Sequence, residues 1–164
     1  MTERLHSSME EHFTCNEEVI GSTPIGGSLI GNNPSLSVVK GDITTAQVMS
    51  HLLVRGYIVL QPWGVSHRYD LVIDDNGKFS RVQCKTGRID DGVIVFNSSN
   101  TYWYGEVRKD YKGQIEYFGV CCIGNNKVYL VPVDVASRTV TRLRVQPTRN
   151  GQNKGIIWAS MYEI

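Results

Sequence analysis

The stretch that decides the fold is YDLVIDDNGKFSRVQCKTG, residues 69–87. Two runs rich in β-branched and aromatic residues, 69–73 and 79–86, flank the pair Asn76-Gly77. An Asn-Gly pair between two such runs favours a β-hairpin with a two-residue loop. The sequence therefore predicts two antiparallel strands that are joined at Asn76-Gly77.

The length of this loop fixes which residues of the hairpin face each other. If Asn76-Gly77 is the whole loop, counting outward along both strands places Asp70 opposite Gln83. Opposed side chains lie roughly 4.5–5.5 Å apart at Cβ, and residues two apart share a face, which adds Lys85. Asp70 is followed directly by the apolar run 71–73, which indicates that it ends a buried strand. We therefore expect Asp70, Gln83 and Lys85 to form one patch.

A carboxylate, an amide oxygen and an ammonium on one face suit the hydrolysis of a phosphodiester. The oxygens of Asp70 and Gln83 are hard donors that suit Mg²⁺, with Mn²⁺ as the alternative. Such a cation polarises the phosphate and helps to generate hydroxide. Lys85 would orient or deprotonate the attacking water, or stabilise charge in the transition state. An ordinary solvated sheet face would display the same residue types, and this is the competing interpretation.

The overall composition limits the classes of protein to consider. The chain has 164 residues, 41% of them hydrophobic, and a net charge of +1, so it suits one domain and any contact with nucleic acid must be local. No apolar run indicates a signal peptide or a membrane span, so we expect a cytoplasmic protein with access to the nucleoid. The cysteines lack CxxC spacing and are expected to be reduced core thiols: Cys15, Cys84, Cys121 and Cys122.

The organisation along the chain predicts an extension followed by a domain. Residues 1–35 end in GSTPIGGSLIGNNPS and are interpreted as an N-terminal extension and linker, and residues 36–164 as the domain. Asp42 is the expected N-cap of a helix that runs to about Arg55. Its apolar residues fall near helical spacing: Ile43, Ala46, Met49, Leu52 and Leu53.

Short runs of β-forming residues predict further strands at 57–60, 93–96, 116–123 and 127–133. The last two are expected to form a hairpin around residues 124–126. Residues 98–111 are ambiguous and could include a helix. The sequence thus predicts an α+β protein.

The motifs together resemble the PD-(D/E)XK nuclease superfamily, and within it the homing endonucleases encoded in group I introns. The resemblance covers about residues 38–164 and is carried by Lys40-Gly41-Asp42, RGYIVLQPWG, RYDLVID, RVQCKTG, KVYLVPVD and RNGQNKGIIWA. It implies a restriction-endonuclease-like fold, in which a mixed β-sheet is flanked by helices in an α/β/α-like arrangement with core order α-β-β-β-α-β.

The resemblance also implies roles for the patch. Asp70 is similar to the motif aspartate, which binds metal, and Lys85 to the motif lysine. Gln83 takes the usual acidic position, as is known for the intron-associated branch, and the carbonyl of Cys84 is a further ligand. The implied metal ligands are therefore Asp70, Gln83 and Cys84.

The family usually has a glutamate in the first helix, and by this register that position falls on Thr45. Asp42 lies one turn earlier and is the best local substitute, which makes it the fourth catalytic candidate. This role competes with its expected role as N-cap.

DNA contacts are expected from basic residues, because Arg and Lys usually position phosphates. A solvated basic face is the alternative interpretation. Tyr102, Trp103 and Tyr104 could stack on bases, although packing in the core or at a subunit interface competes with that role. The candidates for DNA binding are Arg68, Arg142, Arg144, Arg149 and Lys154.

The function predicted from these residues is a sequence-specific, Mg²⁺-dependent endonuclease of the homing type that cuts double-stranded DNA. One site cuts one strand, so a homodimer or homotetramer is expected. The first alternative is a Holliday-junction resolvase on the same fold. The second is a DNA-binding module with a decayed nuclease centre, which Thr45 and Gln83 suggest.

Overall fold

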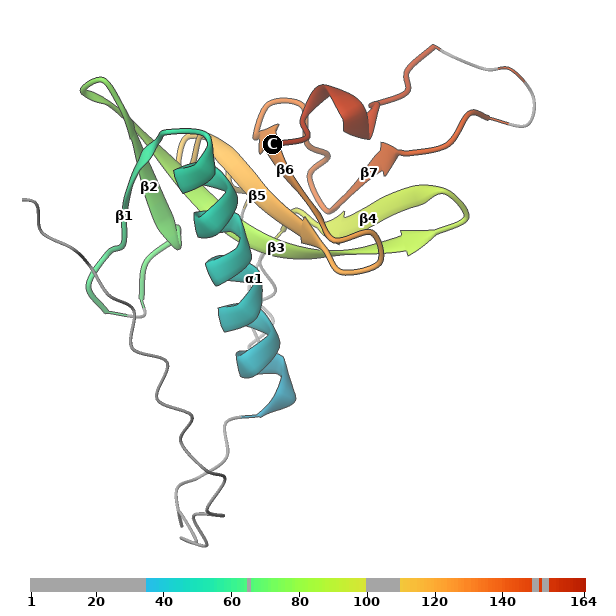
Figure 1. The fold of residues 1–164 in the computed structure, drawn as a ribbon. Helices are drawn as coiled ribbons and strands as arrows, with labels where there is room; N and C mark the ends of the chain where they lie inside the picture. The colour runs from blue at the N-terminus through green and yellow to red at the C-terminus, as the bar shows by residue number, and fades with distance from the viewer. Residues whose placement is uncertain (1–34, 65, 100–109, 149–150, 152–153) are drawn as a thin grey trace, which may run out of the picture. The chain divides into compact units, whose positions relative to one another are not determined.

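A computed structural model describes residues 35–64, 66–99, 110–148, 151 and 154–164. Within these ranges the chain forms one α-helix, seven β-strands and a short 3-10 helix (Figure 1). No helix among the described residues is long and apolar enough to cross a membrane. The elements are α1 (Leu36–Val54), β1 (Ile58–Leu60), β2 (Leu71–Asp75), β3 (Lys78–Asp90), β4 (Val93–Asn97), β5 (Tyr117–Cys122), β6 (Lys127–Pro132), β7 (Val140–Arg144) and the 3-10 helix Ala159–Met161.

The hairpin of β2 and β3 has the predicted register. Asp75 opposes Lys78 and Leu71 opposes Val82. Asn76 and Gly77 have φ angles of 53° and 87°, which fit a two-residue turn with both central residues in left-handed conformations. The prediction of the hairpin and its register is confirmed.

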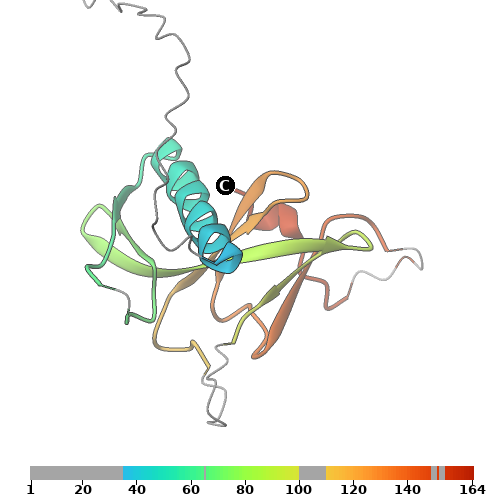
Figure 2. The ribbon, with the colours of Figure 1, turned by 90° about the horizontal axis from the view of Figure 1, so that it is seen from below.

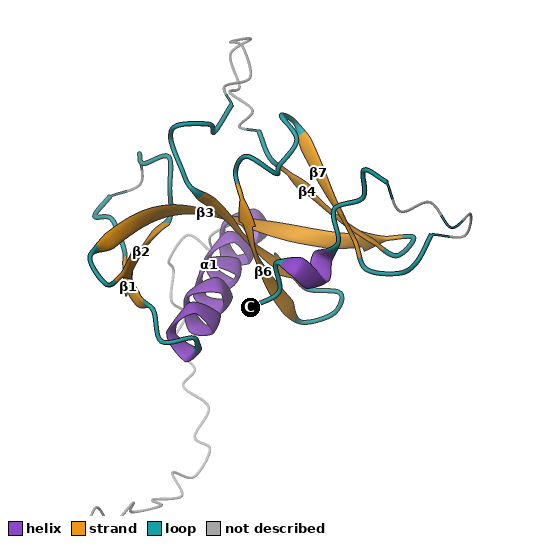
Figure 3. Ribbon diagram, turned by 90° about the horizontal axis from the view of Figure 1, so that it is seen from above, coloured by secondary structure: helices purple, strands orange, loops and turns teal. Residues whose placement is uncertain are grey.

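The long strand β3 organises the sheet, because it pairs with three strands along its length. It is antiparallel to β2 up to Val82 and to β4 from Arg88 onward, and parallel to β5 over the intervening stretch. Figure 3 shows β1 and β2 at one end of β3 and β4 and β7 at the other. Residues 83–87 therefore pair with β5 on one edge and leave the other edge of β3 open.

Helix α1 lies across one face of this sheet (Figure 2). Its buried stripe consists of Thr44, Val48 and Leu52. Val48 sits against Gly119 of β5, where a Cβ atom would come within 2.6 Å of Val48 Cγ1. The absent side chain at Gly119 allows the helix to approach the sheet closely and fixes its position over β3 and β5.

Two expectations about α1 were wrong. The helix begins at Leu36, and the backbone N–H groups of Val38 and Val39 donate to Ser35 O, so Asp42 lies inside the helix and is not its N-cap. The expected apolar face is also shifted, since Ile43 is 50% and Leu53 53% exposed. Close packing at Gly119 selects the narrower stripe of Thr44, Val48 and Leu52 instead.

The other face of the sheet carries a second core cluster, which includes Phe96, Phe118, Tyr129 and Leu143. The strands β5 and β6 form the predicted hairpin, whereas β7 was not expected as a strand. Cys84, Cys121 and Cys122 are buried free thiols, as predicted. Cys15 and residues 100–109, which cover most of the ambiguous segment, lie outside the described residues.

Candidate active site

Asp70 enters the sheet just before β2 and meets β3 as the register predicts. Its backbone N–H donates to Val82 O at 2.9 Å. Its carboxylate oxygen Oδ2 accepts a hydrogen bond from the Cys84 backbone N–H at 2.6 Å and another from Gln83 Nε2. The carboxylate of Asp70 is therefore fixed against the open edge of β3.

The carbonyl of Cys84 faces the same open edge. In a strand, the N–H and C=O of one residue point to the same side, and the Cys84 N–H points at Asp70. Gln83 Nε2 lies 3.4 Å from Cys84 O, in agreement with this direction. A carboxylate, an amide and a backbone carbonyl thus converge at the edge of β3.

Burial raises the pKa of the Asp70 carboxyl above its usual value, although the Cys84 N–H, Lys85 and Gln83 oppose the rise. Burial, together with the nearby Asp70 charge, raises the pKa of the Cys84 thiol to about 12. The Cys84 side chain is packed in the core with Val48, Val82 and Cys121, so the backbone carbonyl is the group of Cys84 that faces the site.

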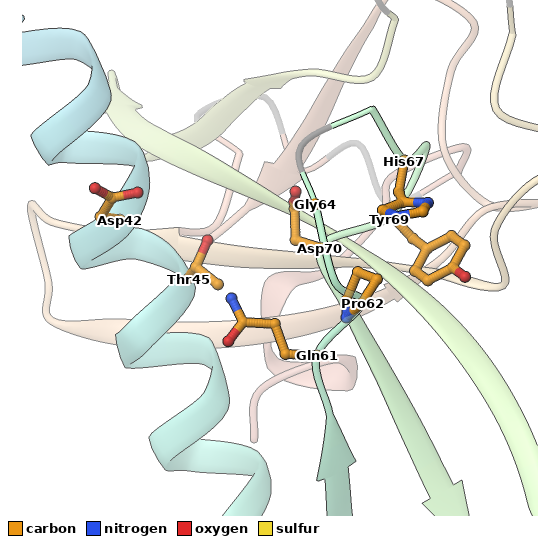
Figure 4. Close-up of a pocket in the computed structure, with 8 residues that line it drawn as sticks. All are labelled: Asp42, Thr45, Gln61, Pro62, Gly64, His67, Tyr69 and Asp70. Atoms are coloured by element: carbon orange, nitrogen blue, oxygen red, sulfur yellow. The ribbon is translucent and has the colours of Figure 1, made fainter.

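Helix α1 forms the opposite wall of the site. A cleft of about 430 Å³ is lined by Asp42 and Thr45 from α1 and by Asp70, Gln83 and Lys85. Figure 4 shows Asp42 and Thr45 on the helix across from Asp70. The Thr45 hydroxyl donates to Gly41 O, 3.1 Å away in its own helix. The four predicted catalytic residues and Thr45 therefore line one cleft.

Lys85 is held by Tyr111, which belongs to the core cluster on the sheet face opposite α1. The Lys85 ammonium donates to the Tyr111 hydroxyl at 3.3 Å and lies 5.2 Å from the ring centroid. The guanidinium carbon of Arg68 lies 4.5 Å from the centroid of the same ring. Tyr111 is only 3% exposed and packs edge-on against Phe118. The buried ring therefore holds two cations, of which Lys85 acts on the charge of Asp70.

Arg68 is anchored within the molecule by further contacts. Its Nε donates to Gln114 Oε1 and its Nη2 to Asp110 O at 3.4 Å. Its Nη1 is buried without a hydrogen-bond partner among the described residues. Sequence reasoning missed Tyr111 and Gln114, because both are far from Lys85 and Arg68 along the chain and belong to no motif.

The remaining candidates for DNA binding lie away from the cleft. Arg142 and Arg144 are on β7, two residues apart and hence on one face. Arg88 shares that face, because Arg88 opposes Val95 and Val95 opposes Arg142. Lys154 lies in the C-terminal segment, and Arg149 is outside the described residues.

The chemistry of the donors suits a hard divalent cation. Within the described ranges, no cluster of three or more His, Cys, Asp and Glu side chains could hold a metal. A Zn²⁺ site of cysteines and histidines is therefore not formed there. The oxygens of Asp70, Gln83 and Cys84 fit Mg²⁺, which needs few protein ligands.

Residues 37–164 match the family model described as PD-(D/E)XK endonuclease. The chain belongs to this family. A solved structure described as a bacterial homing endonuclease, I-Ssp6803I, is similar to this PD-(D/E)XK endonuclease, with a TM-score of 0.63 and 25% sequence identity. The match covers 78% of this chain and 88% of that chain. No curated protein matches the sequence. The fold is thus the predicted restriction-endonuclease-like α+β fold, although the described residues hold the single α-helix α1 instead of helices on both sides of the sheet.

Proposed function

We propose that this PD-(D/E)XK endonuclease cuts double-stranded DNA at a defined sequence, as a homing endonuclease does, by metal-dependent hydrolysis. The observation that carries the proposal is the convergence of Asp70, Gln83 and Lys85 at the open edge of β3. The family and the similarity to a bacterial homing endonuclease support the same activity. Mg²⁺ is the proposed cofactor, with Mn²⁺ as the alternative.

Three oxygens of the chain would hold the cation: a carboxylate oxygen of Asp70, the amide oxygen of Gln83 and the carbonyl of Cys84. Gln83 donates from Nε2 to Asp70, and a 180° rotation of the side-chain amide exchanges Nε2 for the amide oxygen at that position. Asp42 supplies a second carboxylate to the cleft from α1. When bound, a divalent cation polarises the phosphate and lowers the pKa of coordinated water.

Lys85 acts on the charge that develops on the phosphate. Its ammonium lies at the cleft and is oriented by the Tyr111 hydroxyl, so it donates hydrogen bonds from a fixed position. Preorganised donors of this kind stabilise a transition state more than a ground state. Lys85 can also orient the attacking water from the same place.

The basic face of β3, β4 and β7 is the proposed contact for the DNA backbone. Thr86 lines the cleft, and Arg88 is the next residue of β3 on the same face. Arg142 and Arg144 continue this face across β4. Phosphate contacts from these arginines would position the duplex so that it runs from the cleft along the sheet. Arg68, Arg149 and Lys154 complete the proposed set of DNA contacts.

A break in both strands calls for two copies of this site. We therefore propose a homodimer or homotetramer with two-fold symmetry, in which each copy cuts one strand.

Gln83 and Thr45 favour one other candidate function, a DNA-binding module that no longer cuts. Gln83 places an amide where most of the family has a carboxylate, and Thr45 bonds to its own helix at the position of the usual glutamate. The cleft then relies on Asp70 and Asp42 for negative charge. This candidate predicts tight DNA binding without cleavage.

One experiment separates these functions. The protein is incubated with a randomised duplex library and, in parallel, with four-way junctions, each with and without Mg²⁺. Mg²⁺-dependent cleavage of a few related duplex sequences is expected. Binding without cleavage would identify a decayed nuclease, preferential cutting of junctions would identify a resolvase, and cleavage without sequence preference would contradict a homing function.

A further inference from the structure

Trp63 is the most exposed large hydrophobic residue among the described residues, with 98% of its surface accessible. It lies in the loop between β1 and β2. Tryptophan is the largest side chain and is highly buried on average in folded proteins. Leaving the whole indole in water forgoes most of the free energy that its burial would contribute. The whole indole of Trp63 is therefore available for contact with a partner.

A contact within the loop reaches the backbone carbonyl of Trp63, whereas its indole is 98% exposed. A ring nitrogen of His67, Nε2, lies 2.7 Å from Trp63 O and closes the loop. Gly64 follows with a φ angle of 97°, a backbone conformation that residues other than glycine rarely adopt. The His67 ring packs against Tyr69 with centroids 5.8 Å apart, which ties the loop to the residue before Asp70.

The loop that carries Trp63 is also a wall of the active-site cleft. Its residues Gln61, Pro62, Gly64 and His67 line a space of about 420 Å³ together with Asp70. Figure 4 shows Pro62, Gly64 and His67 beside Asp70. Trp63 is the residue between Pro62 and Gly64, which both line this space, and its own indole is exposed to solvent.

We propose that Trp63 packs its indole against bases of the DNA duplex at the rim of the cleft, next to the phosphate that is cut. The proposal rests on the proposed function, because the duplex must occupy the cleft. Aromatic and apolar side chains at DNA interfaces stack on bases or insert between base steps. The neighbouring Gln61 and His67 are polar, whereas the core of a protein interface is more apolar. DNA is therefore a better fit to Trp63 than a second copy of the chain.

The test uses a duplex enriched by binding from a randomised library without metal, so it does not depend on cleavage. Acrylamide quenching of tryptophan fluorescence is measured for the full chain and for Trp63→Phe, with and without this duplex. The difference between the two proteins isolates the signal of Trp63. Saturating duplex is expected to protect that signal from acrylamide.

The affinity for the same duplex is the second measurement. Kd is expected to rise roughly 5- to 150-fold in Trp63→Ala, the loss of one base stack, and less in Trp63→Phe, which keeps a ring. Phe79→Ala is the matched control, because Phe79 is 62% exposed near the far end of the β2–β3 hairpin and should bind like the original chain.

Three results would overturn the proposal. Trp63 could remain open to acrylamide at saturating duplex, or Trp63→Ala could bind as tightly as Phe79→Ala. Protection of Trp63 that grows with protein concentration alone, without DNA, would instead assign it to an interface between copies. If the original chain binds the duplex with Trp63 protected but never cleaves it with Mg²⁺, the nuclease proposal fails and this one stands.

Discussion

Asp70 meets two opposing demands at the level of single residues. Its partial burial raises the pKa of its carboxyl, whereas a cation needs the ionised form. The Cys84 N–H and Lys85 both favour the carboxylate. Gln83 adds a ligand oxygen without adding a second negative charge next to Asp70. An amide at this position therefore lowers the repulsion between ligands and also lowers the attraction for a cation.

Tyr111→Phe tests whether the Tyr111 hydroxyl positions Lys85. The change removes the hydrogen bond to the ammonium and keeps the ring that packs on Phe118 and Arg68. Hydrogen bonds to charged groups contribute about 1.5–3 kcal/mol, so single-turnover cleavage should slow by about 10-fold or more. Kd for the duplex should change little, and the free energy of unfolding should fall by no more than the loss of this one hydrogen bond. An unchanged rate would show that Lys85 does not depend on Tyr111.

At the level of elements, the site depends on how α1, β3 and β5 are packed. Sequence predicted the β2–β3 hairpin because Asn76-Gly77 is a local turn signal that fixes the register. It misplaced the start of α1, since several residues before Asp42 were equally able to begin a helix. It could not find Tyr111, because the contact with Lys85 joins distant segments and depends on the parallel pairing of β3 with β5. Local signals were readable, and contacts between distant segments were not.

Gly119→Ala tests the packing of α1 against β5. The added Cβ would lie 2.6 Å from Val48 Cγ1 and 3.1 Å from Val82 Cγ1, so the helix must shift. Overpacking of this kind costs about 1–3 kcal/mol of stability and moves Asp42 and Thr45 relative to Asp70. The midpoint of urea unfolding and the cleavage rate should both fall. Gly41→Ala is the control for stability alone, because it adds a Cβ in open space on α1 and should leave the free energy of unfolding unchanged or raise it.

Glu116→Gln tests the link between β3 and the segment that enters β5. Glu116 accepts hydrogen bonds from the Arg81 side chain, at 2.6 Å in the ion pair, and from the Arg81 backbone N–H. Hydrogen bonding to Arg81 lowers the pKa of Glu116 below 4.5. The ionised form therefore stabilises the fold above the unfolded pKa, and this contribution is lost as pH falls through the folded pKa.

At neutral pH, Glu116→Gln should lower the free energy of unfolding by about 0.5–1 kcal/mol, because both side chains are more than a third exposed and screened by water. The difference should disappear in acid below the folded pKa of Glu116. Denaturant titrations of both proteins at neutral pH and in acid measure this difference in the free energy of unfolding. If Glu116→Gln loses the same stability at neutral pH and in acid, the charge of Glu116 is not involved.

At the level of the whole molecule, the described domain has a cleft at Asp70 and Lys85 and, farther along β3 and across β4, a basic face. The net charge is only +1, so attraction to DNA depends on where the arginines lie. Arg88 and Arg142 have no ion-pair partner among the residues that the structure describes, and both are exposed. They are therefore available to phosphates of a duplex that extends from the cleft along the sheet.

Arg142→Gln and Arg88→Gln test this face through the salt dependence of duplex binding. Each phosphate contact contributes about 0.9 to the slope of log K against log salt, so each change should lower the slope by about that amount. Lys78→Gln is the control, because Lys78 lies in the hairpin at the end of β3 remote from Arg88. Equal slopes for all three variants would place the DNA elsewhere.

The most direct test of the central claim is the single-turnover cleavage of a selected duplex by Lys85→Ala and by the matched variant Lys78→Ala, each with Mg²⁺. Both changes remove one lysine from β3, but only Lys85 lies at the cleft. Lys85→Ala is predicted to slow cleavage by about 10²–10⁴-fold while duplex binding persists, and Lys78→Ala to cut at the original rate. Cleavage by Lys85→Ala as fast as by Lys78→Ala would contradict an active site built on Asp70, Gln83 and Lys85.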